Sequence, residues 1–267
     1  MHEHPHHDLE TQLFNEAFWR DVFGPDNEPQ REIKPGSRYR TLPGWFPTKK
    51  NVRGRVRTRE PLMADLMIHL DTDPATRVVA EFPIKTNYHV RRPDGTVLTK
   101  EHIPDLAALR RDGRVFVIDV MPWSVQQDIP WIQRRREALT SHYAKLGARY
   151  LLLDETSIRL QPLLNNLKLM WMHKSSGHDL RGMAQLRQAL LDTSYPATME
   201  DLVRTMPSNA IIARWSDEDA SAARHVTECS PVFTAVMQLA MSGELDVDLT
   251  KRFSPSTEVA RKEMAHA

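Results

Sequence analysis

The chain has 267 residues, and its 36 Lys and Arg nearly balance its 35 Asp and Glu. This length allows one large domain or two smaller ones, and the net charge alone gives no argument for a polyanionic partner. The single cysteine, Cys229, excludes an intrachain disulfide and a cysteine-based metal site. No apolar run reaches the length of a membrane-spanning helix, and the N-terminus has no signal-peptide-like segment, so we expect a cytoplasmic protein without membrane contact.

The N-terminal region, residues 1–43, predicts a helix followed by a basic arm. Apolar residues recur at helical spacing between Leu9 and Phe23. From residue 31 to residue 59 the only acid is Glu32, and the basic side chains there include Lys49, Lys50, Arg53, Arg55 and Arg57. Clustered Lys and Arg supply most nonspecific DNA affinity, so we interpret this segment as a phosphate-contacting arm, with a solvated basic loop as the alternative.

Helices and strands then alternate. An amphipathic helix is predicted over Leu62–Pro74, and Thr76–Val90 is rich in β-branched and aromatic residues. A charged amphipathic helix is predicted over Gln126–Leu146, closed by Gly147, before a short strand at Tyr150–Leu153. This order favours an α/β (α+β) fold.

A β-hairpin with one carboxylate in each strand is predicted between these helices. The apolar runs Ile103–Leu109 and Arg114–Met121 flank a connection in which Gly113 supplies the positive φ of a tight turn. Asp105 lies in the first run and Asp119 in the second. A carboxylate in so apolar a strand is costly to bury without a hydrogen-bonding partner or a metal ion.

This layout resembles the PD-(D/E)xK core of restriction-endonuclease-like nucleases. In that core two carboxylates hold a divalent metal, and a Lys two residues after the second orients or activates the attacking water. The resemblance implies that Asp105 and Asp119 are catalytic and bind Mg²⁺ or Mn²⁺. The Lys position, however, holds Met121.

The C-terminal region, residues 178–267, predicts a separate small domain. Short helices are predicted at Met183–Leu191 and Met199–Met206, and a longer helical stretch at Ala222–Met241 that Pro231 should interrupt. Glu244–Leu249 alternates like a strand. Helices followed by a β wing indicate a winged-helix-like module that recognises either DNA or protein.

Several segments occur in the order seen in TnsA, the endonuclease subunit of heteromeric TnsA/TnsB-type transposases. They are Gly44-Trp45-Phe46-Pro47-Thr48-Lys49-Lys50, the Leu62–Pro74 helix, Phe82-Pro83, Pro104-Asp105, Val117-Ile118-Asp119-Val120-Met121-Pro122, and Ser242–Leu249 through Thr257-Glu258-Val259. The resemblance runs from Trp45 to the C-terminus and implies a nuclease-fold domain over residues 44–173 followed by the winged-helix-like domain.

The resemblance also implies an activity and partners. The family cuts the 5′ strands at transposon ends with Mg²⁺, while a TnsB-like transposase cuts and joins the 3′ strands. The C-terminal domain of the family contacts a TnsC-like AAA+ ATPase. We therefore expect transposon-end DNA, these two proteins and a bacterial, nucleoid-associated location.

The chain departs from the family at two catalytic positions. Met63 stands where the helix carries its acidic residue, and Met121 stands in place of the Lys. A Met offers no anionic oxygen to a hard cation and no proton to a water molecule. One hypothesis is a degraded nuclease that acts in assembly and DNA holding.

A second hypothesis is an active enzyme with migrated groups. Glu60 lies one helical turn before Met63 and would supply the acid, and Lys85 or Lys100 would supply the cation. A third hypothesis is a winged-helix DNA-binding regulator with an unrelated α/β domain.

Overall fold

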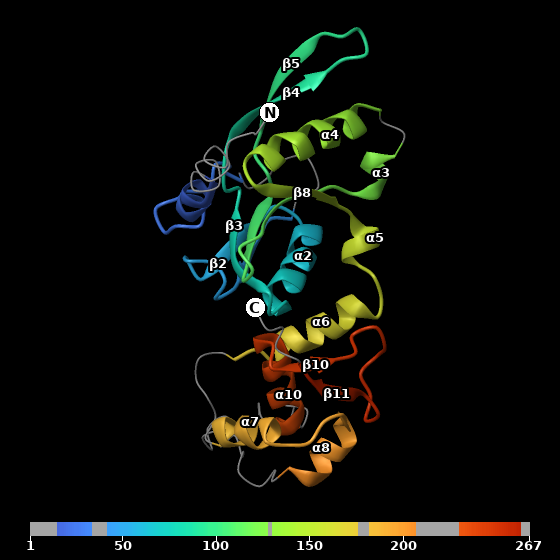
Figure 1. The fold of residues 1–267 in the computed structure, drawn as a ribbon. Helices are drawn as coiled ribbons and strands as arrows, with labels where there is room; N and C mark the ends of the chain where they lie inside the picture. Colours follow the sequence, from blue (N-terminus) through green and yellow to red (C-terminus); the bar gives the residue numbers. More distant parts are fainter. Residues whose placement is uncertain (1–14, 34–41, 128–129, 176–181, 207–229, 263–267) are drawn as a thin grey trace, which may run out of the picture. The chain divides into compact units, whose positions relative to one another are not determined.

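The computed structural model describes residues 15–33, 42–127, 130–175, 182–206 and 230–262 (Figure 1). The chain divides into two compact units, Met1–Leu160 and Gln161–Ala267. The expected boundary at residues 173–178 was therefore too late, because helix α6 (Leu163–Met172) belongs to the second unit. Of the predicted N-terminal helix, residues 15–22 are helical, and the part of the basic arm at residues 34–41 lies outside the described residues.

A four-stranded mixed sheet forms the centre of the first unit. Its strand order is β3-β6-β7-β8, in which β3, β6 and β7 are antiparallel and β7 and β8 are parallel. The strands span Thr76–Glu81, Leu106–Arg110, Val115–Val120 and Ala148–Leu153. The predicted hairpin is confirmed: Leu106 of β6 pairs with Ile118 of β7, and Gly113 in the turn has a φ of +82°.

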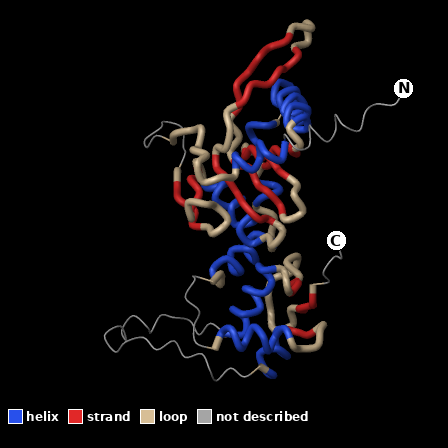
Figure 2. The backbone as a smooth tube through the Cα atoms, turned by 60° about the vertical axis from the view of Figure 1, so that its left-hand side comes forward, coloured by secondary structure: helices blue, strands red, loops and turns tan. Residues whose placement is uncertain are grey.

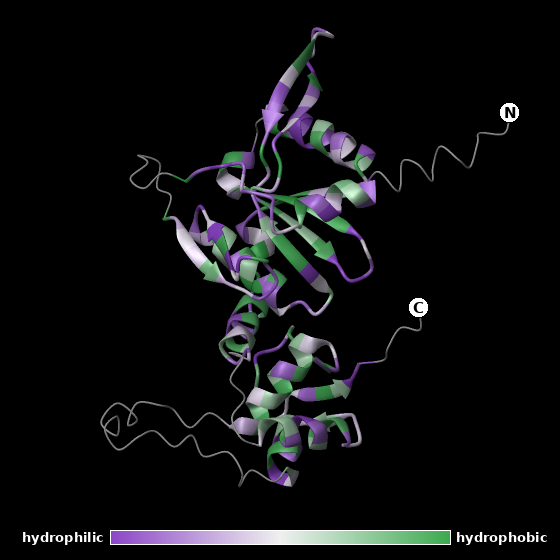
Figure 3. Cartoon of the chain, turned by 90° about the vertical axis from the view of Figure 1, so that its left-hand side faces the viewer, coloured by the Kyte–Doolittle hydropathy of each residue, from purple (hydrophilic) through white to green (hydrophobic). Residues whose placement is uncertain are grey.

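Helix α4 (Pro130–Lys145) packs on β8, and its buried face joins a core with the helix of residues 15–22. That core includes Trp19, Val117, Leu139 and Tyr143. The predicted helix from Gln126 to Leu146 is split: α3 (Trp123–Gln126) ends before residues 128–129, which are not described. The central strands are largely hydrophobic (Figure 3), as expected for strands covered by helices.

The predicted helix Leu62–Pro74 is helix α2 (Pro61–Thr72), which begins at Pro61, a residue whose missing N–H costs nothing in the first turn. It contacts β3 and two further strands, β1 (Gly44–Pro47) and β2 (Arg55–Thr58). Met63, Leu66 and Met67 are buried, and each such side chain contributes about 1.5–3 kcal/mol through removal of its apolar surface from water. The short helix α5 (Glu155–Ile158) packs against α2.

Two hairpins extend the first unit beyond its sheet. Strands β1 and β2 pair antiparallel within the segment expected to be a basic arm. Strands β4 (Thr86–Arg91) and β5 (Val97–His102) form a hairpin that projects beside α4 (Figures 1 and 2). The predicted strand region Thr76–Val90 is thus two strands, β3 and β4, separated at Phe82, which has a φ of +44°.

The second unit contains four helices and a three-stranded sheet among its described residues. After α6 come α7 (Met183–Leu191), β9 (Ala197–Thr198), α8 (Met199–Thr205), α10 (Pro231–Ser242), β10 (Leu245–Val247) and β11 (Glu258–Arg261). The sheet order is β10-β11-β9, antiparallel throughout. Helix α10 begins at Pro231, with the non-helical Ser230 as its N-cap, so the chain is not helical directly before Pro231, as expected. Residues 222–229 of the predicted longer helix are outside the described chain.

No helix in the described ranges combines the length and the apolar character needed to cross a membrane.

Candidate functional site

Asp105 is buried beside an arginine. The residue is 3% exposed, and it directly precedes β6. Arg59 donates from Nε to Oδ1 at 2.6 Å and from Nη2 to Oδ2 at 2.8 Å, so the guanidinium binds the carboxylate with both branches of its fork. The backbone N–H of Val120 also donates to Oδ2 at 2.8 Å, and Nη1 of Arg31 lies 3.6 Å from Oδ1.

Arg59 lies among the acids that the sequence proposed as metal ligands. It sits between β2 and α2, and its Nη1 is 2.7 Å from Oε1 of Glu60. Burial alone would lower the pKa of Arg59, but the hydrogen bond and charge of Asp105 raise it, together with the charges of Glu60 and Asp119. The guanidinium is therefore a permanent cation beside Asp105, one of the two carboxylates that were expected to hold a divalent ion.

Asp119 is held by a second set of groups, on the side of β7 that faces α4. Its Oδ2 accepts from Arg135 at 2.7 Å and from the Tyr150 hydroxyl at 2.7 Å, and it lies 2.9 Å from Nε2 of His102. His102 uses its other ring nitrogen with the Tyr143 hydroxyl at 2.8 Å. Burial opposes ionisation of Asp119, but the hydrogen bond and charge of His102 and the charge of Arg135 hold the pKa of that carboxyl below its ordinary value.

The two carboxylates are neighbours in the backbone but share no partner in the described structure. Asp105 precedes Leu106, Asp119 follows Ile118, and these two flanking residues pair across the strands. A hard divalent cation needs free carboxylate oxygens, and the oxygens of both side chains already accept hydrogen bonds from charged or polar groups. Among the described residues no three His, Cys, Asp or Glu side chains group as metal ligands. The residues present therefore do not fit a Mg²⁺ or Mn²⁺ ion held by Asp105 and Asp119.

We call the Arg59–Asp105 pair the Arg59 clamp and the groups around Asp119 the Asp119 clamp. Met63 and Met121, which stand at the two positions where the chain departs from the family, lie near the Arg59 clamp. Met63 is fully buried, and its Sδ is 3.5 Å from the backbone nitrogen of Arg59. Met121 is half-buried, and its backbone N–H donates to Leu153 as β7 ends. Thioether side chains pack at these points and supply no acid or base.

The proposed replacement groups are engaged elsewhere or exposed. Glu60 faces Arg59, and burial raises the pKa of its carboxyl. Lys85 pairs with Glu101 at 2.7 Å on the β4–β5 hairpin. Lys100 is exposed on β5, where it pairs with Tyr88 in the strand register. The geometry of the described residues brings neither lysine into a hydrogen bond with Asp105 or Asp119.

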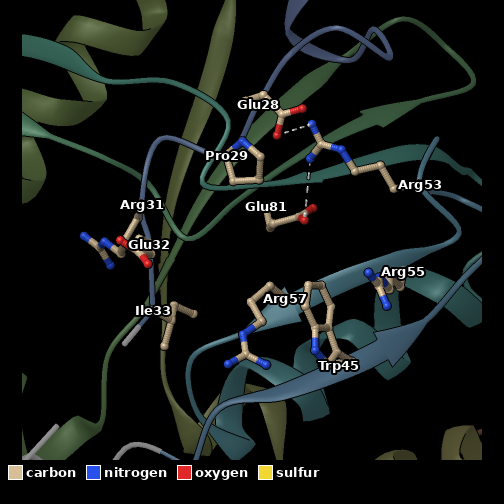
Figure 4. Close-up of a pocket in the computed structure, with 10 residues that line it drawn as sticks. All are labelled: Glu28, Pro29, Arg31, Glu32, Ile33, Trp45, Arg53, Arg55, Arg57 and Glu81. Carbon is tan, nitrogen blue, oxygen red and sulfur yellow. Dashed lines mark ion pairs between the residues drawn. The ribbon is translucent and has the colours of Figure 1, made fainter. Parts of the chain in front are cut away.

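An exposed tryptophan organises the basic β1–β2 hairpin. The indole of Trp45 is 54% exposed, and the guanidinium carbons of Arg55 and Arg57 lie 4.2 and 4.9 Å from its ring centroid. In the view of Figure 4 the two guanidinium groups lie on either side of the ring. These three residues line a groove of about 640 Å³, which we call the β1–β2 groove. Cation–π contacts hold both arginines at the ring.

The structure divides the five predicted DNA-contacting residues into two groups. Lys49, Arg55 and Arg57 sit on or beside the β1–β2 hairpin, where Lys49 and Arg55 are exposed. Lys50 instead donates to the carbonyls of Leu70 and Asp73 at the end of α2, at 2.9 and 2.6 Å, and its burial lowers the pKa of its ammonium to about 8.

Arg53 is also used within the protein. It lies 3.2 Å from Glu28 and 3.9 Å from the buried Glu81 (Figure 4). The charges of Lys50 and Arg53 therefore have partners inside the first unit. The remaining candidates for contact with DNA are Lys49, Arg55 and Arg57.

Sequence reasoning missed the partners that define both clamps. Arg59 ends the basic run, but nothing in the spacing directs it toward Asp105. His102, Arg135 and Tyr150 come from β5, α4 and β8. The apolar setting of Asp119 did signal that some compensating group had to exist. No protein-family model matches the sequence, and the search of curated proteins found no significantly similar chain.

Proposed function

We propose that the chain is a TnsA-like subunit of a heteromeric DNA transposase that holds transposon-end DNA and does not cut it. The order of elements in the first unit supports a restriction-endonuclease-like core: α2, the antiparallel strands β3, β6 and β7, then α4 and the parallel strand β8. Asp105 directly before β6 and Asp119 near the end of β7 would correspond to the paired acids of that core.

The proposal that the chain does not cut DNA rests mainly on the Arg59 clamp, in which Arg59 binds Asp105. Hydrolysis of a phosphodiester in this class needs a metal that generates and orients the nucleophilic water. Arg59 fills the space beside Asp105 and Glu60 with an organic cation that has no exchangeable water ligand. Met121 supplies no ammonium to replace the missing Lys. The acids thus hold the scaffold together, and DNA holding is the activity that remains.

The second unit supports a winged-helix-like module. Its order α7, β9, α8, α10, β10, β11, with β11 between β10 and β9, is the order expected of helices followed by a β wing. Helix α10 contains no Lys or Arg, and most of its apolar side chains are buried. Phosphate contacts depend on such cations, so this helix offers no DNA-contacting face, and we take a protein such as the TnsC-like ATPase as the partner of the module.

DNA holding is tested on the full chain by fluorescence anisotropy with a labelled duplex between about 50 and 200 mM salt. Replacing both arginines of the β1–β2 groove, Arg55→Gln/Arg57→Gln, removes two phosphate contacts, so the slope of log K against log salt should become less steep by about 1.8. The matched control is Arg111→Gln/Arg114→Gln, which removes two exposed arginines from the β6–β7 turn, where Arg114 is paired with Asp112.

Trp45→Ala tests whether the ring positions those arginines. We expect weaker binding in this variant, whereas Trp123→Ala, which removes an indole of similar exposure at 46%, should bind as the wild type does. Equal affinity and equal salt slope in the wild type and the Arg55/Arg57 variant would refute the proposed function.

A further inference from the structure

A second basic groove lies between the β4–β5 hairpin and α4. Its volume is about 450 Å³, and it shares no lining residue with the β1–β2 groove. The basic side chains that line it are His89, Arg91, Arg92, Arg134, His142 and Lys145, against the single acid Glu137. We propose that this groove, the β4–α4 groove, binds the phosphate backbone of a nucleic acid.

One wall of the groove is a row of side chains along α4. His142 and Lys145 follow Arg134 by eight and eleven residues, so the three side chains lie on one face of the helix. At 1.5 Å per residue the row is about 16 Å long. Phosphates of one DNA strand are about 3.4 Å apart along the duplex axis, so the row matches about five nucleotide steps.

The other wall comes from the projecting hairpin. Arg91 ends β4 and Arg92 directly follows it, both are exposed, and His89 lies two residues before Arg91 on the same strand. A guanidinium presents a rigid fork of donors that matches two phosphate oxygens. In the parts of the chain that the structure describes, no ion pair engages Arg91, Arg92, Arg134 or Lys145, so their charges are available to a ligand.

Burial and neighbouring positive charge disfavour protonation of His142, so the fixed cations of the groove are its arginines and Lys145. Burial is the main reason that the pKa of His142 is lowered, and the positive charges of His102, Lys145 and His89 lower it further. The Thr86 hydroxyl lies 2.9 Å from Nε2 of His142 and fixes the ring between hairpin and helix. Collecting like charges in a groove costs stability, and a bound polyanion offsets that cost.

A nucleic acid fits this groove better than an acidic peptide does. Protein partners are usually anchored by a few buried aromatic or aliphatic side chains in fitted pockets. Apart from the charged residues, this groove is lined by Val90, Pro93, Ala138 and Ser141, which offer little apolar area. An open groove with cationic side chains on both walls matches the phosphate backbone of a nucleic acid. This inference does not rest on the transposase assignment, since it requires only a phosphodiester ligand.

The test uses the full chain and a labelled duplex of about 30 base pairs, titrated between about 50 and 200 mM salt. The groove variant, Arg91→Gln/Arg134→Gln, removes one cation from each wall. We expect the slope of log K against log salt to be less steep by about 1.8 in this variant. In the combined variant with Arg55→Gln/Arg57→Gln the slope should be less steep by about 3.6. Arg111→Gln/Arg114→Gln again serves as the control with the same change in charge, and circular dichroism checks that each variant is folded.

The outcomes separate this proposal from the function proposed above. If the groove variant binds with the wild-type slope and affinity, the β4–α4 groove is not a nucleic-acid site, and the Arg55/Arg57 result still decides the proposed function. If a polyglutamate peptide binds the wild type but not the groove variant while duplex binding is unchanged, the groove takes an acidic peptide and the inference is overturned. If duplex binding weakens in the Arg91/Arg134 variant but not in the Arg55/Arg57 variant, the result supports the β4–α4 groove and counts against the β1–β2 groove.

Discussion

Replacing Arg59 should destabilise the first unit more strongly than the loss of any surface ion pair. In Arg59→Met, Asp105 remains buried at 3% exposure with only the Val120 N–H and the more distant Arg31 as partners. Removing one member of a buried ion pair costs about 3–5 kcal/mol. Because the Arg59 side chain is 25% exposed, so that water reaches part of it, the lower end of that range, about 3 kcal/mol, applies.

Urea unfolding followed by circular dichroism measures this cost. With a dependence on urea of about 2 kcal/mol per molar, the midpoint should fall by about 1.5 M. The surface control Arg114→Met, whose partner Asp112 is also exposed, should leave the midpoint nearly unchanged.

A double-mutant cycle shows whether the effect belongs to the pair. Once Arg59 is absent, Asp105→Asn removes an uncompensated charge, so the double variant Arg59→Met/Asp105→Asn should be more stable than Arg59→Met alone. A fall of less than about 1 kcal/mol for Arg59→Met, or strictly additive effects in the cycle, would show that Asp105 does not depend on the guanidinium.

Two further predictions concern pH. The pKa of Asp119 is depressed in the folded chain below its ordinary value of 3.8, so its stabilising effect is present above that pH and is lost as the pH falls through the folded pKa. Asp119→Asn should therefore be less stable at neutral pH but lose less stability than the wild type on acidification, as urea midpoints at about pH 6 and pH 3 would show; equal losses would contradict this. Lys50 has a folded pKa of about 8 against an ordinary value of 10.5, so between these values the unfolded chain binds more protons and the wild type should gain stability with rising pH. Thermal midpoints should show that gain in the wild type and not in Lys50→Met, and the same gain in both would refute the role given to Lys50.

The elements of the central sheet were predictable because their sequence periods are strong. The β6–β7 hairpin combined two apolar runs with Gly113 in a position that requires positive φ, and helix α2 combined Pro61 with a regular apolar face. The β1–β2 hairpin was missed, because β1 is a four-residue strand with a Gly and a Pro, and β2 is a four-residue strand with two Arg, so neither shows a clear apolar alternation. Its pairing depends on Trp45 and the arginines above it, a contact across strands that spacing does not reveal.

The chemistry of the site was less predictable than its backbone. The sequence placed Asp105 and Asp119 on adjoining strands, and burial required that each have a compensating group. Whether that group is a metal ion or a guanidinium depends on residues that are distant in the chain: Arg59 lies 46 positions before Asp105, and Arg135 lies 16 positions after Asp119. Only the folded arrangement distinguishes these alternatives.

Manganese binding, followed by electron paramagnetic resonance on the full chain, tests most directly the claim that Arg59 has replaced a metal ion. Free and bound Mn²⁺ give different signals, and histidine side chains can also bind the ion, so His2, His4, His6 and His7 would first be replaced by Asn. We predict that this chain and its Asp105→Asn derivative take up Mn²⁺ equally weakly. One tightly bound Mn²⁺ per chain that is lost in the Asp105→Asn derivative would contradict the account.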